Sequence, residues 1–333
     1  MWFEDLMGFR EQNPKQVREN IEVIGNRLIS KANNQSYIYG ELTTPSLEEL
    51  RESSPLLNNF KEKIKLSEIV GNVQTLHCLE ENNGAFFQAA SQFNLLEMVS
   101  PNVTPEEGVG RYEYDKTQGP ACAIACGAGT IYRNYFADVN GRVGQTHDNQ
   151  IDCLKDIGVK LENEKHGLWK MLNGYALATN DGLKQINKIL SETTPDEYER
   201  LKGLLRIGIQ SDTQVTIYNS SNFVSQAYCS ALPIAYTNVN LDLWEPFARL
   251  VLEATYEATI YAALNNYQKT NNNKVFLTLV GGGVFGNKIE WILGAIEKAL
   301  IKFKQTPLDV MIVSYGSSNK YVKDSVDAFN CKL

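Results

Sequence analysis

Three consecutive glycines separate a hydrophobic segment from an amphipathic one near the end of the chain. The stretch from Lys274 to Asn287 reads KVFLTLVGGGVFGN, and a helix is predicted to begin near Ile289. Glycine permits positive φ and close approach of the backbone to a ligand, and the start of the helix offers unpaired N–H groups. Such a junction is suited to binding an anion, usually phosphate. The alternative interpretation is a glycine-rich turn that binds no ligand.

A second junction of the same kind lies at 114–136, which reads YDKTQGPACAIACGAGTIYRNYF. Thr117 is the predicted N-cap, and Pro120 suits the first helical turn. The side chains that follow are almost all small, which leaves room for a ligand or, alternatively, for tight packing of the helix on a sheet. Two junctions that both offer N–H groups are what a diphosphate needs.

The segment 92–116, just before the second junction, is rich in carboxylates. Its acidic residues are Glu97, Glu106, Glu107, Glu113 and Asp115. A carboxylate can transfer a proton, activate water or stabilise positive charge that develops in a transition state. Asp115 is the first candidate for catalysis because it lies two residues before the junction, followed by Glu107, Glu106 and Glu97. The alternative for each is a solvated acidic loop.

Composition narrows the function classes. The 333 residues are 43% hydrophobic and 21% charged, as in globular proteins, and the net charge of −7 argues against a large nucleic-acid surface. The first residues lack a signal-type apolar core and no segment reaches the length of a membrane span, so we expect a cytoplasmic or nuclear protein. The six cysteines and three histidines form no metal-binding pattern, and we expect reduced core thiols.

The elements that must position these residues follow from hydrophobic periodicity. The chain is predicted to begin with a short helix and a hairpin over 21–45, whose turn lies at Asn33 and Asn34. A helix at 46–52 with a capping box and a helical linker to about 66 follow. Charged helices are predicted at about 145–205. Strands are predicted at 73–79, 85–90, 214–218, 223–236, 275–280 and 309–314, and helices from about 119, at 244–267 and at 289–304. This alternation predicts a mainly parallel or mixed sheet between helices, with ligands at the carboxyl ends of the strands. Neither a dinucleotide fingerprint nor a lysine-bearing P-loop fits the glycine segments.

The order of these features resembles that of macrodomains, the ADP-ribose-binding α/β/α modules, in a divergent form similar to poly(ADP-ribose) glycohydrolases and to MavL-type effectors that remove ADP-ribose from arginine. Residues 86–91, FFQAAS, resemble the family strand that ends in V-N-A-A-N, and 281–287 resemble its second diphosphate loop. Thr117 to Cys122 takes the place of the first loop, and Tyr315 that of the aromatic residue over the adenine. The resemblance spans about 71–319. The usual first glycine triplet and the glycohydrolase signature with Gln-Glu-Glu are absent, which argues against cleavage of poly(ADP-ribose) chains.

The resemblance implies a three-layer α/β/α sandwich with a mixed sheet, comprising an N-terminal extension (1–66) of helix, hairpin and helix, and a macrodomain-like domain (67–333) with a helical insertion at about 145–205. It implies an ADP-ribosyl hydrolase that releases ADP-ribose from modified protein side chains, arginine first. The alternatives are a non-catalytic reader of ADP-ribose and a hydrolase or transferase of another nucleotide sugar.

The resemblance also implies the partners and the site. The expected partners are ADP-ribose and an ADP-ribosylated protein, without nucleic acid or membrane. No cofactor is expected, although carboxylates can hold Mg²⁺. The expected ligand-binding residues are Glu80, Gln88, Ser91, Thr117, Gln118, Gly119, Ala121, Cys122, Gly281, Gly282, Gly283, Val284, Phe285, Gly286, Asn287 and Tyr315.

Overall fold

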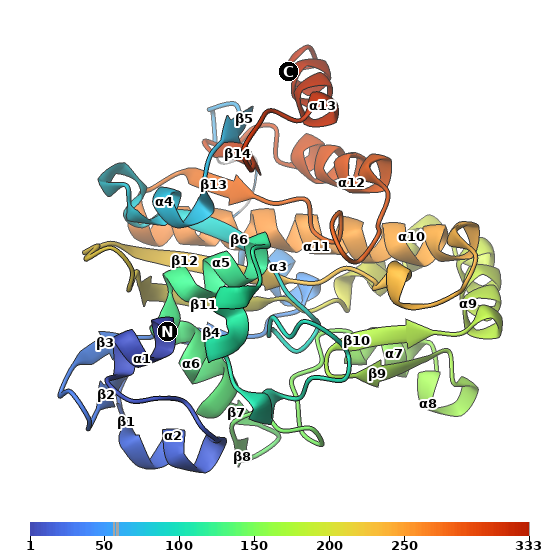
Figure 1. The fold of residues 1–333 in the computed structure, drawn as a ribbon. Helices are drawn as coiled ribbons and strands as arrows, with labels where there is room; N and C mark the ends of the chain where they lie inside the picture. The colour runs from blue at the N-terminus through green and yellow to red at the C-terminus, as the bar shows by residue number, and fades with distance from the viewer. Residues whose placement is uncertain (56, 58–59, 333) are drawn as a thin grey trace.

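A mixed seven-stranded sheet forms the centre of the computed structural model, which describes residues 1–55, 57 and 60–332 (Figure 1). In sheet order its strands are β4 (Glu41–Thr43), β11 (Gly208–Gln214), β12 (Phe223–Cys229), β6 (Phe86–Ala90), β13 (Lys274–Leu277), β14 (Asp309–Ser314) and β5 (Lys65–Val70). Within this sheet β11 runs antiparallel to both of its neighbours, and the five strands from β12 to β5 are parallel. The carboxyl ends of these five strands therefore meet at one edge.

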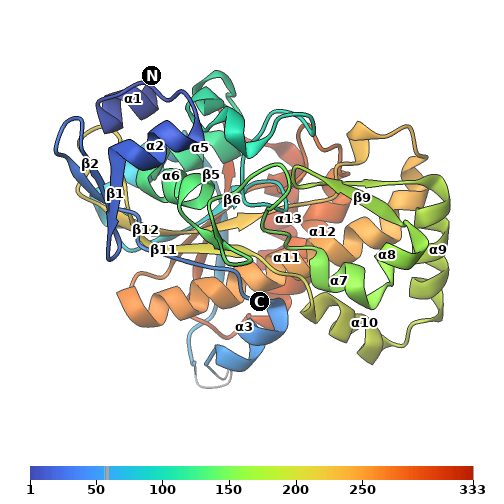
Figure 2. The same cartoon turned by 90° about the horizontal axis from the view of Figure 1, so that it is seen from below.

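Helices cover both faces of the sheet, which gives the three layers seen in Figure 2. One layer contains α4 (Val73–Cys78), α5 (Gln118–Ala125) and α6 (Gly127–Tyr135). The opposite layer contains α3 (Leu47–Ser53), α9 (Asn180–Glu192), α10 (Pro195–Gly203), α11 (Leu241–Thr270), α12 (Ile289–Lys302) and α13 (Lys320–Asn330). The central strands are buried on both faces because both faces are covered, and Phe87 of β6 stacks on Phe276 of β13 with 4.4 Å between ring centroids. The predicted α/β fold with a mixed sheet is confirmed.

The N-terminal region packs beside this core. Helices α1 (Trp2–Met7) and α2 (Pro14–Asn20) precede an antiparallel sheet of β1 (Ile21–Ile24), β2 (Arg27–Ser30) and β3 (Ser36–Ile38). The predicted turn near Asn34 is confirmed, since this residue has φ +57° between β2 and β3. The predicted capping box before α3 is confirmed as well, with Ser46 and Glu49 as its two members.

The segment 138–203 contains helices and two short hairpins. Its elements before α9 are β7 (Asp138–Val139), β8 (Arg142–Val143), α7 (Lys155–Lys160), α8 (Asn163–His166), β9 (Trp169–Leu172) and β10 (Tyr175–Ala178). Short 3₁₀ helices lie elsewhere in the chain at η2 (Glu80–Asn82), η3 (Pro105–Glu107), η4 (Gly110–Tyr114) and η5 (Ile234–Tyr236). None of the helices in the described part of the chain is long and apolar enough to cross a membrane.

Helix α4 corrects a predicted strand. Residues 73–78 are helical because the side chain of Asn72 accepts a hydrogen bond from Gln74 N–H and caps the first turn. The buried residues of this helix are Val73, Leu76 and His77, at the three- and four-residue spacing of a helix face.

Other predicted boundaries also differ from the structure. The strand predicted at 214–218 lies earlier, as β11, and β12 ends at Cys229, before the predicted end at 236. The predicted helical linker to about 66 falls partly outside the described residues, and its described part at 60–64 is not helical. Strand β5 and helix α13 were not predicted.

Candidate functional site

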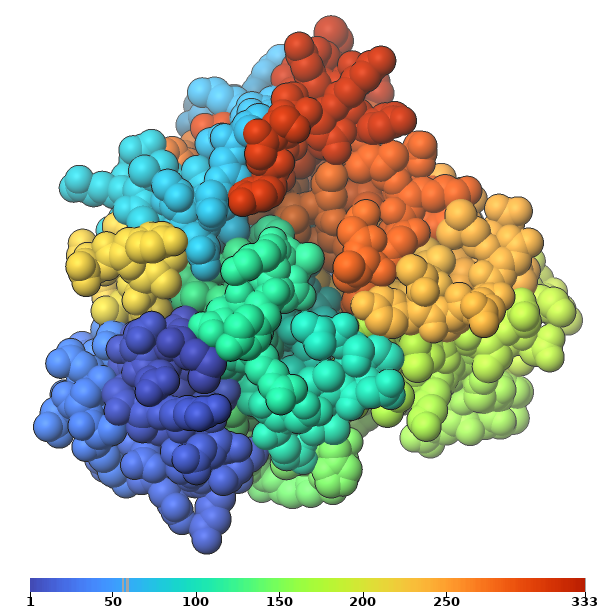
Figure 3. Space-filling view, in the orientation of Figure 1, coloured from blue at the N-terminus to red at the C-terminus, as the bar shows by residue number. Residues whose placement is uncertain are grey.

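Two adjoining cavities open at the carboxyl edge of the parallel strands, where Figure 3 shows the surface hollowed between the teal, orange and red segments. The wide cavity has a volume of about 860 Å³ and is lined by segments that follow β5, β14 and η4. The narrow cavity has a volume of about 270 Å³ and is lined by segments that follow β6 and β13. The residues that line both cavities, where the two meet, are Asp115, Thr117, Gln118, Thr278 and Leu279.

The side chain of Gln118 fastens the start of α5 to the end of β6, at the boundary between the cavities. Its Nε2 donates to the carbonyl of Gln88 over 2.8 Å, and its Oε1 accepts from Ala90 N–H over 3.0 Å. One residue earlier, Thr117 N–H donates to Asp115 Oδ1 over 2.8 Å. Asp115 therefore lies at the start of a helix whose position is fixed by two hydrogen bonds to a buried strand.

On two sides of the narrow cavity, lining residues carry backbone N–H groups that have no acceptor among the described residues. Gln118 and Gly119 lie in the first turn of α5, where N–H groups have no acceptor within the helix. Across the cavity, the glycine loop 281–285 offers N–H groups that make no hydrogen bond to any described residue. These belong to Gly281, Gly283, Val284 and Phe285. Such donors, together with the positive end of the helix dipole, attract an anion.

The backbone and side chain of Asn287 close the glycine loop. Asn287 N–H donates to the carbonyl of Gly281 over 2.9 Å, and its Nδ2 donates to the carbonyl of Leu232 over 2.9 Å. Gly281 has φ +77°, a value that other residues disfavour. A Cβ at Gly283 would meet nothing within 4 Å, so the backbone at this position is open to a ligand.

Glu97 brings a buried carboxyl group to the narrow cavity. It is only 6% exposed, and its carboxyl packs against Gly119 at the first turn of α5, where a Cβ would collide with it. Its Oε1 is buried and has no hydrogen-bond partner among the described residues. Burial raises the pKa of this carboxyl well above its ordinary value, Arg133 opposes the shift, and the nearby Asp115 adds to it. The carboxyl group of Glu97 therefore keeps its proton to a higher pH than an exposed carboxyl group, and it lies near a second acid.

Three aromatic rings line the narrow cavity together. The centroids of Tyr175, Tyr236 and Phe285 lie 5.0, 5.3 and 5.6 Å apart in tilted and edge-on arrangements. The hydroxyl of Tyr175 donates to the carbonyl of Met98 over 2.6 Å, which ties the rings to the segment that carries Glu97. The rings offer flat apolar surfaces next to the two carboxyl groups.

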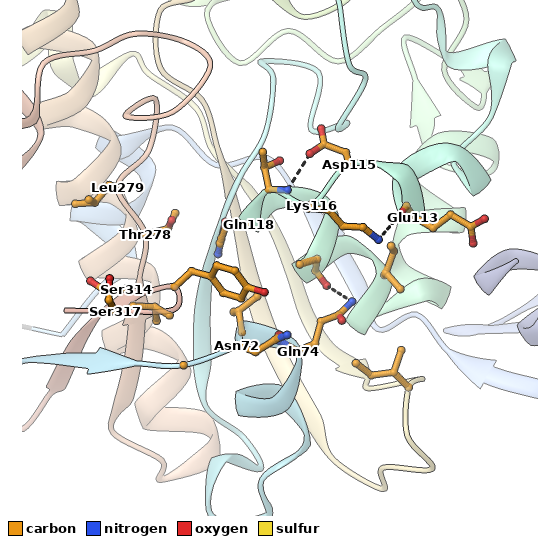
Figure 4. A pocket seen from close by; sticks show the side chains of 18 of the residues that line it. Asn72, Gln74, Glu113, Asp115, Lys116, Gln118, Thr278, Leu279, Ser314 and Ser317 are labelled. Carbon is orange, nitrogen blue, oxygen red and sulfur yellow. Dashed lines mark hydrogen bonds between the residues drawn. The ribbon is translucent and has the colours of Figure 1, made fainter. Parts of the chain in front are cut away.

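The wide cavity is lined by several polar side chains from the strand ends. Figure 4 shows Asn72 and Gln74 at the start of α4, Ser314 and Ser317 at the end of β14 and after it, and Lys116 on the far side of Gln118. Among the described residues that line the two cavities, Lys116 is the only basic one.

The loop after β14 is held in place by Glu68. Its carboxylate accepts hydrogen bonds from the hydroxyls of Ser314 and Ser318 and from Asn319 N–H. These bonds lower the pKa of Glu68, although burial opposes them. Tyr315 lies on this loop and is 81% exposed, so its ring is free to stack on a ligand.

Most of the predicted site residues meet at these cavities. The wide or the narrow cavity is lined by Ser91, Glu97, Asp115, Thr117, Gln118, Gly119, Ala121, Gly281, Gly283, Val284, Phe285 and Tyr315. The two linings do not include Glu80, Gln88, Glu106, Glu107, Cys122, Gly282, Gly286 and Asn287.

Three of the excluded residues are acids with other positions or partners. Glu80 lies in η2, before β6, so it is at the amino edge of the sheet, opposite the edge where the cavities open. Glu106 accepts hydrogen bonds from the N–H and the ring of His147, and Glu107 pairs with Arg111 over 2.9 Å. Of the four acids predicted to be catalytic, the structure brings Glu97 and Asp115 to one cavity.

The other excluded residues differ in burial: Gln88, Cys122 and Asn287 are buried, whereas Gly282 and Gly286 are exposed. Gln88 is fully buried, donates to Thr259 Oγ1 over 2.8 Å and accepts from Thr278 N–H. The thiol of Cys122 is buried against the side chain of Gln118. Gly282 donates its N–H to the carbonyl of Leu279 inside the loop.

Sequence reasoning missed several lining residues. Asn72 lies just after β5, and this position beyond the end of a strand would have been a signal if β5 had been recognised. Tyr175 and Tyr236 belong to no local motif, so only the tertiary structure brings them to the narrow cavity. Within the described residues, no group of three or more His, Cys, Asp or Glu side chains is arranged to hold a metal ion.

Comparison with known proteins gives distant structural similarities. No protein-family model matches the chain, and no curated protein sequence matches it. A poly(ADP-ribose) glycohydrolase from Deinococcus radiodurans, in complex with ADP-ribose, is 11% identical, with 88% of this chain and 94% of that chain covered and a TM-score of 0.47. The poly(ADP-ribose) glycohydrolase from Thermomonospora curvata is 9% identical over 96% of this chain and 97% of that chain, with a TM-score of 0.45.

Proposed function

We propose that this protein is an ADP-ribosyl hydrolase that releases ADP-ribose from modified protein side chains. The observation that carries the proposal is one cavity lined by two groups of residues whose backbone N–H groups have no acceptor among the described residues, beside a buried carboxyl group with a raised pKa. The N–H groups of Gln118 and Gly119 and of the loop 281–285 match the needs of a diphosphate. Glu97 matches the needs of an acid catalyst.

The two cavities accommodate the two ends of the ligand on either side of the diphosphate. In this arrangement the adenosine occupies the wide cavity, where the ring of Tyr315 can stack on the base and the amide of Asn72 can donate a hydrogen bond to it. The distal ribose occupies the narrow cavity, so that its C1″ atom faces Glu97 and Asp115.

The different surroundings of the two acids suggest their roles. Glu97 is buried and has a raised pKa, which suits a proton donor, whereas Asp115 is half-buried and suits a carboxylate that stabilises positive charge on the ribose and takes a proton from water. In the reaction the bond between C1″ and the side-chain atom breaks, and that atom receives the proton of Glu97. Water then forms the new bond to C1″ and gives its proton to Asp115. Exchange with solvent returns both acids to their starting states.

Arginine is the side chain that this cavity favours as the leaving group. The carboxylate of Asp115 can pair with a guanidinium, and the rings of Tyr175, Tyr236 and Phe285 offer flat faces on which a planar cation can stack. Serine-linked and glutamate-linked ADP-ribose lack a cation at this position and are expected to be weaker substrates.

Two measurements test the proposal. Calorimetry with ADP-ribose tests the binding site, and the expected result is saturable binding. Incubation with peptides that carry ADP-ribose on arginine, serine or glutamate tests the chemistry, and the expected result is release of ADP-ribose fastest from arginine. Binding without release from any linkage would make the protein a reader of ADP-ribose, and absence of binding would favour another nucleotide sugar.

A further inference from the structure

The N-terminal arm, residues 2–11, holds the loop that precedes Asp115. Both oxygens of Glu11 accept hydrogen bonds from this loop: Oε1 from Val109 N–H over 3.0 Å and Oε2 from Gly110 N–H over 2.6 Å. Glu11 Oε1 also accepts from the hydroxyl of Tyr135 over 2.6 Å. A single carboxylate therefore joins the arm, the loop and helix α6.

The loop is shaped around this carboxylate. A Cβ at Gly108 would lie 2.5 Å from Glu11 Oε2, and a Cβ at Gly110 would lie 2.7 Å from the same atom. Gly108 also has φ +88°, which residues with side chains disfavour. The two glycines thus make room for the side chain of Glu11, which is distant from them in the sequence.

The same loop reaches both acids of the proposed site. Helix η4 starts at Gly110, and the hydroxyl of Tyr112 in this helix accepts a hydrogen bond from Glu97 N–H over 2.8 Å. At the other end of η4, Asp115 donates its N–H to the carbonyl of Tyr112. Glu11 lines neither cavity, so it has no contact with a ligand that occupies them.

A second residue of the arm strengthens the connection. Trp2 donates its backbone N–H to Glu113 Oε2 over 3.1 Å and its indole Nε1–H to the carbonyl of Val109 over 3.3 Å. The buried side chains of Phe3, Leu6 and Met7 anchor the arm to the core. The arm therefore contacts η4 near both of its ends.

We propose that Glu11 is a positioning residue for the hydrolysis: it fixes η4, and through η4 it sets Glu97 and Asp115 at the ribose. This inference rests on the proposed function. Displacement of a catalytic group by about 1 Å can lower turnover about a hundredfold while ligand contacts elsewhere persist. Loss of Glu11 is therefore expected to affect turnover and not the affinity for ADP-ribose.

The test compares Glu11→Ala and Tyr135→Phe with Glu4→Ala, a control in the same arm whose exposed side chain makes no hydrogen bond to any described residue of the loop. We expect kcat on ADP-ribosylated arginine to fall at least about tenfold in Glu11→Ala and less in Tyr135→Phe, with the Kd for ADP-ribose unchanged. Formate, which can occupy the space of the missing carboxylate, is expected to restore part of the activity of Glu11→Ala. Equal losses of kcat and of affinity, or unchanged kcat, would overturn the proposal.

Hydrogen exchange separates this inference from the proposed function. If the wild-type chain binds ADP-ribose but releases none, the hydrolase proposal fails. The role of Glu11 is then judged from amide exchange over 108–117, which is expected to accelerate in Glu11→Ala and Tyr135→Phe and not in Glu4→Ala. Unchanged exchange in folded Glu11→Ala would contradict the positioning role, and if Glu11→Ala does not fold, Tyr135→Phe alone decides.

Discussion

The narrow and the wide cavity share a boundary but differ in construction. The narrow cavity combines a buried acid, a half-buried acid and three aromatic rings in mutual contact, and its polar side chains are largely shielded from water. The wide cavity is lined by exposed side chains such as Asn72, Lys116 and Tyr315. Water weakens electrostatic interactions, so groups that perform proton transfer gain from shielding, whereas groups that only recognise a base do not need it.

The difference predicts that mutations of the acids in the narrow cavity change rates and that mutations in the wide cavity change affinities. Stability offers a further contrast. A buried carboxyl group with an unpartnered oxygen destabilises the fold, whereas exposed polar residues contribute little to it.

The largest effect is expected for Glu97→Gln and Asp115→Ala. Each removes a proton-transfer group, so turnover is expected to fall at least about a hundredfold with little change in ADP-ribose affinity. Glu97→Gln is also expected to unfold at a higher temperature than the wild-type chain at pH 7. Because the pKa of Glu97 is raised in the folded state, its carboxyl ionises more easily in the unfolded state. The free energy of unfolding therefore falls as the pH rises above the ordinary pKa of a glutamate. Glutamine does not ionise and so removes this loss.

Single-turnover hydrolysis and thermal unfolding provide the measurements for both acids. Glu106→Gln is the control, because this acid lies in the same segment but is bonded to His147 outside the cavities. A Glu97→Gln variant with wild-type turnover would remove the acid role and leave the narrow cavity as a binding site only.

A smaller effect is expected at the glycine loop. Gly283→Val adds a branched side chain where the backbone faces open space in the narrow cavity, so ADP-ribose binding is expected to weaken at least about tenfold without loss of stability. Gly282→Val is the matched comparison. A Cβ there would lie 3.1 Å from Ile292 Cδ1 and 3.2 Å from the carbonyl of Leu279, so this variant is expected to lose stability instead. Calorimetry and thermal unfolding of both variants decide, and the loop leaves the site if Gly283→Val binds normally.

In the wide cavity, Tyr315→Ala is expected to weaken binding of ADP-ribose and of AMP by the same factor. Loss of stacking on adenine costs about 1–1.5 kcal/mol, or roughly tenfold in Kd, and leaves kcat unchanged. Tyr321→Ala is the control, since this exposed ring lies on α13 outside both cavities. A weaker Kd for ADP-ribose with an unchanged Kd for AMP would place the base elsewhere.

The smallest effect concerns pH and the helix that forms a wall of the wide cavity. His77 of α4 is fully buried; its Nδ1–H donates to the carbonyl of Val73, and its Nε2 accepts from the amide of Gln226. Burial lowers its pKa from 6.5 to about 4. As the pH falls, His77 takes up a proton in the unfolded state before it does so in the folded state. The stability that His77 contributes is therefore present above about pH 6.5 and declines as the pH falls towards 4.

Between pH 7 and pH 5.5 we expect the free energy of unfolding to fall by about 1 kcal/mol on account of His77. Denaturant unfolding at the two pH values measures this change, and His77→Gln is expected to reduce it. An exposed histidine, His147, has a raised pKa because of Glu106, so its protonation favours the folded state as the pH falls, opposite to that of His77. The same pH dependence in His77→Gln and in the wild-type chain would show that other groups cause it.

Local sequence patterns predicted the glycine loop and the helix that follows it. The strand, the glycines after it and the start of α12 at Ile289 depend on neighbouring residues, and each was found in the structure. The strand, predicted at 275–280, ends earlier, at Leu277. The start of α5 was predicted at about 119 from Thr117 and Pro120, one residue after its observed start at Gln118. Thr117 occupies the N-cap position, but its side chain makes no capping hydrogen bond. Helix α4 was mistaken for a strand because a segment of six residues is too short for its periodicity to be decisive.

The identity of the acids at the cavity could not be predicted in this way. Glu97, Glu106 and Glu107 have the same chemistry in the sequence. Burial distinguishes Glu97, and this burial depends on Gly119 and on the hydroxyl of Tyr112, both of which come well after it in the chain. Other lining residues, such as the two tyrosines of the narrow cavity, reach it from separate segments, and long-range packing of this kind leaves no local signal.

The N-terminal region also protects an edge of the central sheet. Strand β4 lies at one end of the sheet and pairs with β11 through three residue pairs, and α13 packs on β5 at the other end. Unpaired strand edges promote self-association between chains. A shortened chain that begins after Thr43 would expose β11 to pairing with another chain and would also lack Glu11. Production of the protein for crystallography or screening should therefore retain the residues up to Thr43.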